Sequence, residues 1–329
     1  SFRTVGRYFN AEPGSDKFRE IEMRYCRAMA EHRLNPPIPG YLLPEVNKDG
    51  SLTISPERHE ALKQYLAELH VADFEIPRAP FARLSVAATG PDYKQVPPDQ
   101  RAKAQRYYRE YYDYLKRSGW EKDAYVYLWD EPNEGQAREL RDHNAWRHAF
   151  DKHHPTFIAS CRPDLFKMHA SFADVFAMDP YTSSAQALEW CRRAQKEVAG
   201  DLHKPVVVIP WADSKPGDIP FQAWIAIVHD ARGIIWYCWS QVGGGPSGVG
   251  IWDKPEKQAI YKELLPLIKT VQPGITSVQR RCFEAGDLHG IVGGDHPGQR
   301  YLIVLNVNEN AKAAPDAEGR RSGSRVEHR

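Results

Sequence analysis

The chain has 329 residues, a formal net charge of +1 and 26% charged residues, so no global basic surface points to a nucleic acid or an anionic membrane as partner. Its length suits one large domain with an appendage, or two medium domains. No apolar run approaches the roughly 18 residues of a membrane span, and we expect none.

Short apolar segments alternate with amphipathic helical segments almost from end to end. The helical segments begin and end at recognisable residues. Ser15, Ser55 and Asp99 are expected to cap the first, second and third, and Gly119 to end the third. Eight strands are expected between the helices, over residues 2–9, 32–40 (a weak one), 71–79, 124–131, 156–161, 174–181, 204–212 and 232–241.

Eight strand–helix pairs within roughly 270 residues match an α/β (β/α)₈ TIM barrel, whose typical length is about 250 residues. A doubly wound sheet is the alternative fold. It needs a Gly-rich phosphate-binding turn after the first strand, and RYFNAEPGSD is not such a turn. We therefore predict a TIM barrel.

The sequence pattern changes after Pro273. The segments ITSVQRRCFE, LHGIVGG and QRYLIVLNVNE alternate like antiparallel strands, and the segment that follows them is polar and poor in hydrophobic residues. We predict a barrel over residues 1–272, a small antiparallel β appendage over residues 273–310, and a disordered tail over residues 311–329.

Cysteine usage and the chain start leave the compartment open. Five scattered cysteines show no CxxC or zinc spacing, so we expect buried free thiols. The chain opens SFRTVG without Met, so we expect a processed or cut start, with secretion or a periplasmic location among the alternatives. The oligomeric state stays open.

Three other motifs have ordinary interpretations. Four histidines, His143, His148, His153 and His154, lack metal-ligand spacing, and we expect no metal and no organic cofactor. The segment GGGPSGVG lacks the Lys-Ser/Thr of a P-loop and is expected to be a flexible lid. The pairs Arg192–Arg193 and Arg280–Arg281 are expected on solvated faces.

Active sites of TIM barrels are built from the loops at the carboxyl ends of the strands. Candidate site residues are therefore sought at the ends of the predicted strands. The polar and aromatic residues at these ends include Asn35, Arg78, Asp130, Glu131, Asp179, Tyr181, Trp211, Asp213 and Trp239.

The stretch YVYLWDEPNE ends the fourth strand with two adjacent carboxylates, Asp130 and Glu131. Pro132 has no N–H for the ladder and is expected to hold Glu131 extended, so that the strand ends there and both side chains reach the barrel mouth. A carboxyl group beside another carboxylate tends to keep its proton, as a general acid must near neutral pH. A surface acidic turn that caps the next helix is the alternative.

Glycoside hydrolysis normally needs two carboxylates that flank the scissile bond. Many sugar-cleaving barrels place the second on a Glu at the end of strand seven, but VVVIPWADSKPG offers only Asp213 there. Either Asp213 serves, or the 2-acetamido group of the sugar is itself the nucleophile, as in substrate-assisted enzymes. Two neighbouring acids suit the second scheme, one to polarise the acetamide and one to protonate the leaving oxygen.

YLWDEP, with the downstream MDPY and ARGIIWYCWS, resembles the catalytic barrel of glycoside hydrolase family 123, the substrate-assisted β-N-acetylgalactosaminidases. The resemblance covers roughly residues 1–271. It does not include the N-terminal β-sandwich that precedes the barrel in that family. It implies a retaining β-N-acetylhexosaminidase, with Asp130 assisting the acetamide and Glu131 acting as general acid and then base.

On this hypothesis the partner is an amino-sugar glycoside. Tyr181 is predicted to hydrogen-bond the acetamide, Trp211 and Trp239 to wall the sugar ring, and Arg78 and Asn35 to bind hydroxyls; each also has an ordinary packing explanation. Asp179 is a further candidate that could instead support the turn before Pro180. Two other hypotheses stay open: a two-carboxylate retaining glycosidase that uses Glu131 and Asp213, and a catalytically silent carbohydrate-binding barrel.

Overall fold

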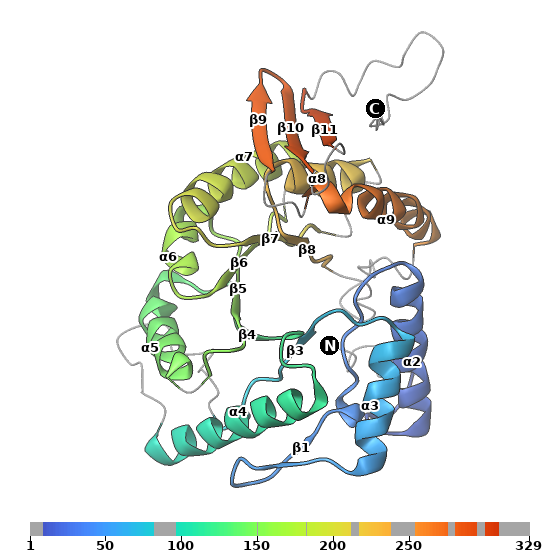
Figure 1. Ribbon diagram of the computed structural model, residues 1–329, viewed down its shortest axis with the longest axis vertical. Coiled ribbons are helices and arrows are strands. Elements are labelled where there is room, and N and C mark those ends of the chain that lie inside the picture. The colour runs from blue at the N-terminus through green and yellow to red at the C-terminus, as the bar shows by residue number, and fades with distance from the viewer. Residues whose placement is uncertain are drawn as a thin grey trace. The chain divides into compact units, whose positions relative to one another are not determined.

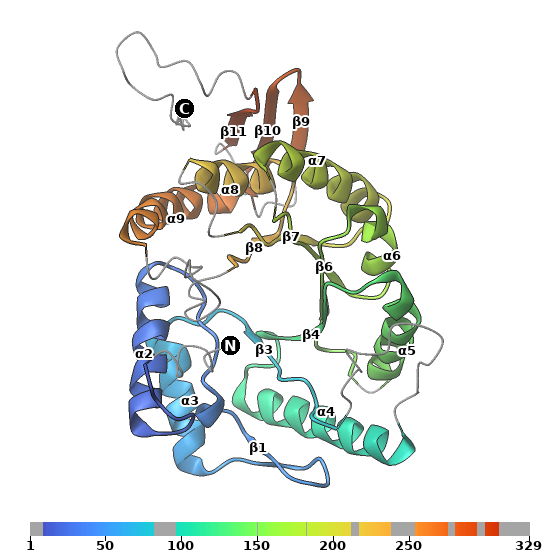
Figure 2. The same cartoon turned by 180° about the vertical axis from the view of Figure 1, so that it is seen from behind.

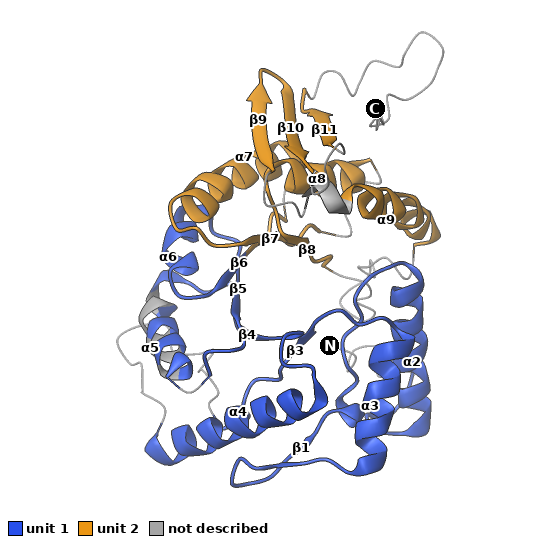
Figure 3. Cartoon of the chain, viewed as in Figure 1, with its two compact units in different colours: residues 1–176, 241–248 blue, residues 177–240, 249–329 orange. Residues whose placement is uncertain are grey.

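The computed structural model describes residues 9–81, 97–149, 151–181, 183–211, 217–237, 254–275, 280–294 and 300–308. The chain divides into two compact units, coloured separately in Figure 3. Unit 1 comprises Ser1–Phe176 with Gln241–Gly248, and unit 2 comprises Ala177–Ser240 with Val249–Arg329. The predicted lid GGGPSGVG and the predicted disordered tail lie outside the described residues.

A six-stranded sheet arranges its strands strictly in chain order, which can be followed in Figure 1 and from behind in Figure 2. Strand β3 pairs with β4, β4 with β5, and β7 with β8, in each case in parallel. The strands are β3 (Phe74–Glu75), β4 (Ala124–Asp130), β5 (Thr156–Ser160), β6 (Val175–Met178), β7 (Val206–Val208) and β8 (Gly233–Ile234). This sequential order, with helices between strands, confirms the predicted α/β class and matches part of a TIM barrel.

The described residues do not form a closed eight-stranded barrel, and this corrects the prediction. The first predicted strand, residues 2–9, lies outside the described residues except for Phe9. The second, residues 32–40, contains no strand. Its prolines Pro36, Pro37 and Pro39 have no N–H to donate to a neighbouring strand, which explains why this segment does not join the sheet.

The first three long helices are α2 (Asp16–Glu31), α3 (Pro56–Glu68) and α4 (Pro98–Ser118). The predicted caps of the first two are confirmed: Ser15 Oγ accepts the Phe18 N–H at 3.2 Å, and Ser55 Oγ accepts the Arg58 N–H at 3.2 Å. Asp99 does not cap α4, because Pro97 occupies the N-cap position and Asp99 lies within the first turn.

The core of unit 1 forms where the buried faces of these helices meet β3 and β4. Tyr107, Tyr111 and Leu115 of α4 are buried at the spacing of one helix face, together with Leu62 and Tyr65 of α3. Large side chains of this kind each gain roughly 1.5–3 kcal/mol from burial, so they dominate the stability of this unit.

The remaining helices follow the strands in alternation. They are α5 (Ala137–His148), α6 (Phe166–Ala170), α7 (Ser184–Ala194), its continuation Gln195–Gly200, α8 (Asp218–Val228) and α9 (Pro255–Ile275). Helix α8 is apolar nearly all round and buried from Ile219 onward except at Pro220, as expected for a helix with neighbours on several sides. Short elements complete the description: the hairpin β1 (Glu45–Val46) with β2 (Leu52–Thr53), and 3₁₀ turns Gly40–Leu42, Glu134–Gln136 and Pro163–Leu165.

The predicted antiparallel appendage is confirmed as a three-stranded sheet in unit 2. It contains β9 (Arg281–Ala285), β10 (Leu288–Gly293) and β11 (Tyr301–Asn306), with β10 in the centre. Ile291, Ile303 and Leu305 are buried, and β10 and β11 contact α8 and α9. None of the helices in the described part of the chain combines the length and the apolar character needed to cross a membrane.

Candidate active site

The end of β4 carries a β-bulge that sets the orientation of its last residues. Tyr127 pairs with Phe157, but the next partners are Trp129 with Ile158 and Asp130 with Ala159, so one extra residue lies on β4. Residues three apart on a regular strand point to opposite faces, and a one-residue bulge places them on the same face. Tyr127 and Asp130 therefore meet.

Asp130 is held by this neighbour. The Tyr127 hydroxyl donates a hydrogen bond of 2.5 Å to Asp130 Oδ1. The Tyr127 ring lies 5.8 Å below the guanidinium carbon of Arg78, which comes from the carboxyl end of β3. Arg78, Tyr127 and Asp130 thus form a chain of contacts across two adjacent strand ends, and its polar tip is exposed.

Glu131 follows directly and has an unusual backbone. We expected an extended conformation before Pro132, but the φ of Glu131 is +47°, in the left-handed region that non-glycine residues seldom adopt. Its N–H still donates to Ala159 O at 3.1 Å, so the strand pairing extends to the turn itself. Such a conformation costs on the order of 1 kcal/mol or more, and strained backbone of this kind clusters at functional sites.

The pKa of the Glu131 carboxyl is raised above its ordinary value. The main cause is partial removal of water around the carboxyl group, followed by the negative charge of Asp130. The Cys161 thiol, just beyond β5, opposes this shift by donating a hydrogen bond to the carboxylate. Two adjacent carboxylates therefore differ in surroundings, one bound by a tyrosine hydroxyl and one inclined to hold its proton.

The loop that carries Cys161 is fixed by a buried pair. Ser160 Oγ lies 2.8 Å from His169 Nδ1 of α6 and accepts the Arg162 N–H at 3.3 Å. Burial lowers the pKa of His169 to about 4, so its ring is neutral near pH 7. These bonds anchor the residues on both sides of Cys161.

Unit 2 places aromatic side chains at the carboxyl ends of its own strands. Tyr181 packs against Tyr237 with ring centroids 5.5 Å apart, and Trp211 forms a parallel backbone bridge with Tyr237. The exposed fractions of Tyr181, Trp211 and Tyr237 are 37%, 38% and 40%, high for large aromatic groups. Asp179 is buried at 1% exposure, and its carbonyl accepts the Tyr181 N–H at 2.9 Å.

Three other candidates are placed elsewhere. The Asn35 side chain donates to Asp73 and accepts the Ala72 N–H at 3.0 Å, so it fixes the amino end of β3, away from the end that carries Arg78. Trp239 and Asp213 lie outside the described residues.

Sequence reasoning missed Tyr127, Cys161 and Tyr237. Tyr127 was assigned to the body of a strand, and only the bulge turns it toward Asp130. Cys161 was expected to be buried like the other thiols. Cys26 and Cys191 are buried, whereas Cys161 and Cys282 are half-buried, and none of these four forms a disulfide. Tyr237 is two residues before Trp239 and had the same signal, an aromatic residue near a strand end.

No family model matches the sequence, and no curated protein matches it. A family 39 glycoside hydrolase from the gut symbiont Bacteroides cellulosilyticus WH2 is similar in structure, with a TM-score of 0.52 and 10% identity over 91% of this chain and 70% of that chain. A family 123 glycoside hydrolase from Clostridium perfringens gives a TM-score of 0.47 and 12% identity over 86% and 62%. An uncultured Clostridium sp. beta-glucuronidase gives 0.46 and 13% over 75% and 47%.

The chain thus spans about half the length of the glucuronidase. At these identities the likeness concerns fold alone. The family 39 structure, with its TM-score of 0.52, is similar to this chain in fold.

Proposed function

We propose that the chain is a glycoside hydrolase, a retaining β-N-acetylhexosaminidase that uses the 2-acetamido group of its substrate as nucleophile. The observation that carries the proposal is the pair Asp130 and Glu131 at the exposed end of β4. Enzymes often assign separate acid and base roles to two neighbouring carboxyl groups whose surroundings give them different pKa values.

Glu131 is the proposed general acid, because its raised pKa keeps part of the population protonated at higher pH than an ordinary glutamate. Its proton passes to the leaving oxygen as the glycosidic bond breaks. The acetamide carbonyl oxygen forms the new bond to the anomeric carbon, which closes an oxazolinium ring. Glu131, now a carboxylate, then takes a proton from the water that opens the ring, so the anomeric configuration is retained.

Asp130 is the proposed partner of the acetamide. Its carboxylate would accept the acetamide N–H and stabilise the positive charge of the oxazolinium ring. Tyr127 holds one oxygen of this carboxylate at 2.5 Å, which leaves the other oxygen for the substrate. Arg78 is proposed to bind a sugar hydroxyl. Tyr181 and Trp211 remain proposed sugar-binding residues, and Tyr237 is proposed as a third.

The fold likeness to a family 39 glycoside hydrolase supports a sugar-cleaving barrel. The preference for an N-acetylgalactosamine-type sugar rests on the sequence resemblance to family 123 and on the neighbouring acids.

The test is a panel of aryl β-glycosides with and without the 2-acetamido group, assayed on the wild type, Asp130→Asn and Glu131→Gln. We expect turnover of acetamido sugars only, and inhibition by a thiazoline analogue of the acetamido sugar. Glu131→Gln should lose most activity toward poor leaving groups and much less toward activated aryl groups.

Glu134→Gln is the matched control, because Glu134 is an exposed acid three residues downstream and is expected to be dispensable. Turnover of sugars that lack the acetamido group would contradict substrate assistance and favour the two-carboxylate alternative. Binding without turnover of any glycoside would contradict an enzymatic function.

A further inference from the structure

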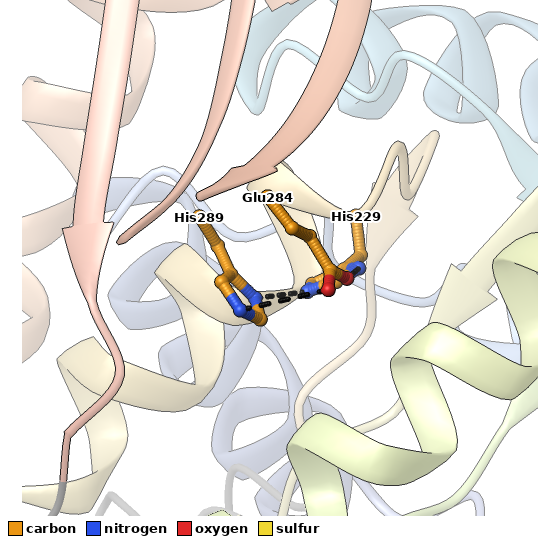
Figure 4. Close-up of side chains that lie close together, drawn as sticks. All are labelled: His229, Glu284 and His289. Carbon is orange, nitrogen blue, oxygen red and sulfur yellow. Dashed lines mark hydrogen bonds and ion pairs between the residues drawn. The ribbon is translucent and has the colours of Figure 1, made fainter. Parts of the chain in front are cut away.

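A second cluster of reactive side chains lies in unit 2, far along the chain from the carboxylate pair. His229 follows α8, Glu284 belongs to β9 and His289 to β10, and Figure 4 shows the three side chains directed toward one another. One potential ligand atom from each lies within 4.8 Å of the others. Both imidazole side chains are almost fully buried, at 2% and 0% exposure, and Glu284 reaches them from the surface.

The hydrogen bonds determine where the ring protons are. Arg192 donates to His289 Nε2 at 2.9 Å, and a guanidinium can only donate, so this nitrogen is unprotonated. His289 Nδ1 then carries the proton and donates to His229 Nε2 at 3.0 Å. His229 Nδ1 in turn donates to the Gln195 side-chain oxygen at 3.0 Å. Both rings are therefore neutral, the form in which histidine binds metals.

Arg192 is the cation that this cluster now holds. Its guanidinium donates to both oxygens of Glu284, at 3.1 and 2.9 Å, as well as to His289. Three acceptor atoms thus converge on one positive group. The Arg192 side chain is 38% exposed and comes from the last turn of α7, so it can turn out into water and regain its hydration. Arg192 thus lies at a partly exposed face, as expected, and also pairs with Glu284.

We propose that His229, Glu284 and His289 form a binding site for a divalent cation of the zinc class, for which Arg192 competes. Two imidazoles and one carboxylate are a donor set that zinc uses in proteins, with water as a fourth ligand. The unprotonated nitrogens are His229 Nε2 and His289 Nε2, so zinc would bind these two atoms after His289 Nδ1–H releases the first and Arg192 releases the second. One potential ligand atom from each of the three residues lies within 4.8 Å of the others. Ligands about 2.1 Å from a tetrahedral ion are roughly 3.4 Å apart, so the separations of up to 4.8 Å need to shorten by as much as about 1.4 Å.

The donor set also predicts selectivity. Magnesium and calcium require mainly oxygen ligands, and here two of the three donors are nitrogens from the buried rings. Zinc, and nickel or copper with similar preferences, should therefore bind, whereas magnesium should not.

The experiment titrates zinc chloride into the full chain, purified without a histidine tag and freed of metal with a chelator, by calorimetry at pH 7.5. We expect one equivalent of zinc to bind and to raise the melting temperature. Arg192→Met should bind zinc at least tenfold more tightly, since the competing cation is gone. His229→Gln and His289→Gln should each weaken binding at least tenfold.

Arg193→Met is the matched control for the arginine, because Arg193 is the next residue on α7 and pairs with Glu197 at 2.7 Å, outside the cluster. His203→Gln serves likewise as an exposed histidine in the same unit. Both controls should bind zinc like the wild type.

Zinc should also raise the melting temperature of Arg192→Met, because zinc bound to the thiols and imidazoles of an unfolded chain would lower it. This second measurement keeps the test decisive if a histidine variant is unstable. The proposal is overturned if neither the wild type nor Arg192→Met binds zinc. It is equally overturned if the two histidine variants bind like the wild type, which would place the metal on other groups such as thiols, or if Arg192→Met gains no affinity.

Discussion

Replacing Tyr127 with Phe tests whether the hydrogen bond to Asp130 matters for the proposed reaction. The change removes one hydroxyl and keeps the ring, which packs against Phe157 at 5.3 Å between centroids and lies under Arg78. The hydroxyl donates the hydrogen bond of 2.5 Å to Asp130 Oδ1. The substitution therefore removes the bond that holds this carboxylate and keeps the ring.

The magnitude follows from the kind of bond. A hydrogen bond to a charged group contributes about 1.5–3 kcal/mol, and the exposed position of this one favours the lower end. Since each 1.36 kcal/mol of transition-state stabilisation is worth about tenfold in rate, kcat/KM should fall about tenfold. The positive charge that Asp130 is proposed to stabilise develops in the transition state, so the loss should appear in kcat more than in KM.

The assay compares kcat and KM on an aryl 2-acetamido glycoside for the wild type, Tyr127→Phe and Tyr125→Phe. Tyr125 lies two residues earlier on β4, also packs against Phe157, and serves as the matched control. Melting temperatures should be nearly unchanged for Tyr127→Phe, because its hydroxyl is exposed. A kcat/KM within twofold of the wild type would refute the positioning role of Tyr127.

Two further predictions concern stability. Gly290→Ala should lower the free energy of unfolding by about 1–3 kcal/mol in urea titrations, because the new Cβ would lie 2.6 Å from Ile303 O and against the Phe283 ring. Gly217→Ala is the control. Its Cβ would meet open space, so the free energy of unfolding should be nearly unchanged. Burial lowers the pKa of His169 from 6.5 to about 4 in the folded chain. Between pH 6.5 and pH 4 the unfolded chain therefore binds a proton that the folded chain does not. The free energy of unfolding should fall by about 3 kcal/mol as the pH drops from 6.5 to 4. His169→Gln should remove this part of the pH dependence, and an unchanged profile would contradict it.

Much of the fold could be predicted because the local signals are strong. Ser15 and Ser55 cap their helices as the sequence indicates, Gly119 ends α4 with φ of +75°, and β4 covers the predicted apolar run almost residue for residue. The second strand was predicted only weakly, and three prolines prevent it. Helix α4 begins two residues earlier than expected because Pro98 suits the first helical position.

The candidate site could be predicted only in part. The pair Asp130 and Glu131 was found because two acids before a proline at a strand end are visible in the sequence. The Tyr127 contact depends on a bulge against β5, and register irregularities of this kind are set by the partner strand. The contact of Arg192 with Glu284 joins residues 92 positions apart, so no local pattern could indicate it.

The groups around Glu131 also predict opposite shifts of the pH–rate profile. The high-pH limb of kcat/KM reports the pKa of the general acid in the free enzyme. Burial raises this pKa most, the Asp130 charge raises it further, and the Cys161 thiol lowers it. Cys161→Ala removes the donor and should move the limb to higher pH, whereas Asp130→Asn removes the charge and should move it to lower pH with a much reduced rate.

Cys161→Ser is the matched control, because its hydroxyl can still donate to the carboxylate and should leave the limb near its original position. The profiles are measured with a glycoside whose leaving group needs protonation, since an activated aryl group would hide the role of the acid. Shifts of the two variants in the same direction, or a limb that stays fixed in Cys161→Ala, would mean that another group titrates there. Glu131 would then not be the general acid, even if its loss abolished activity, because a carboxylate can be essential for binding without donating a proton.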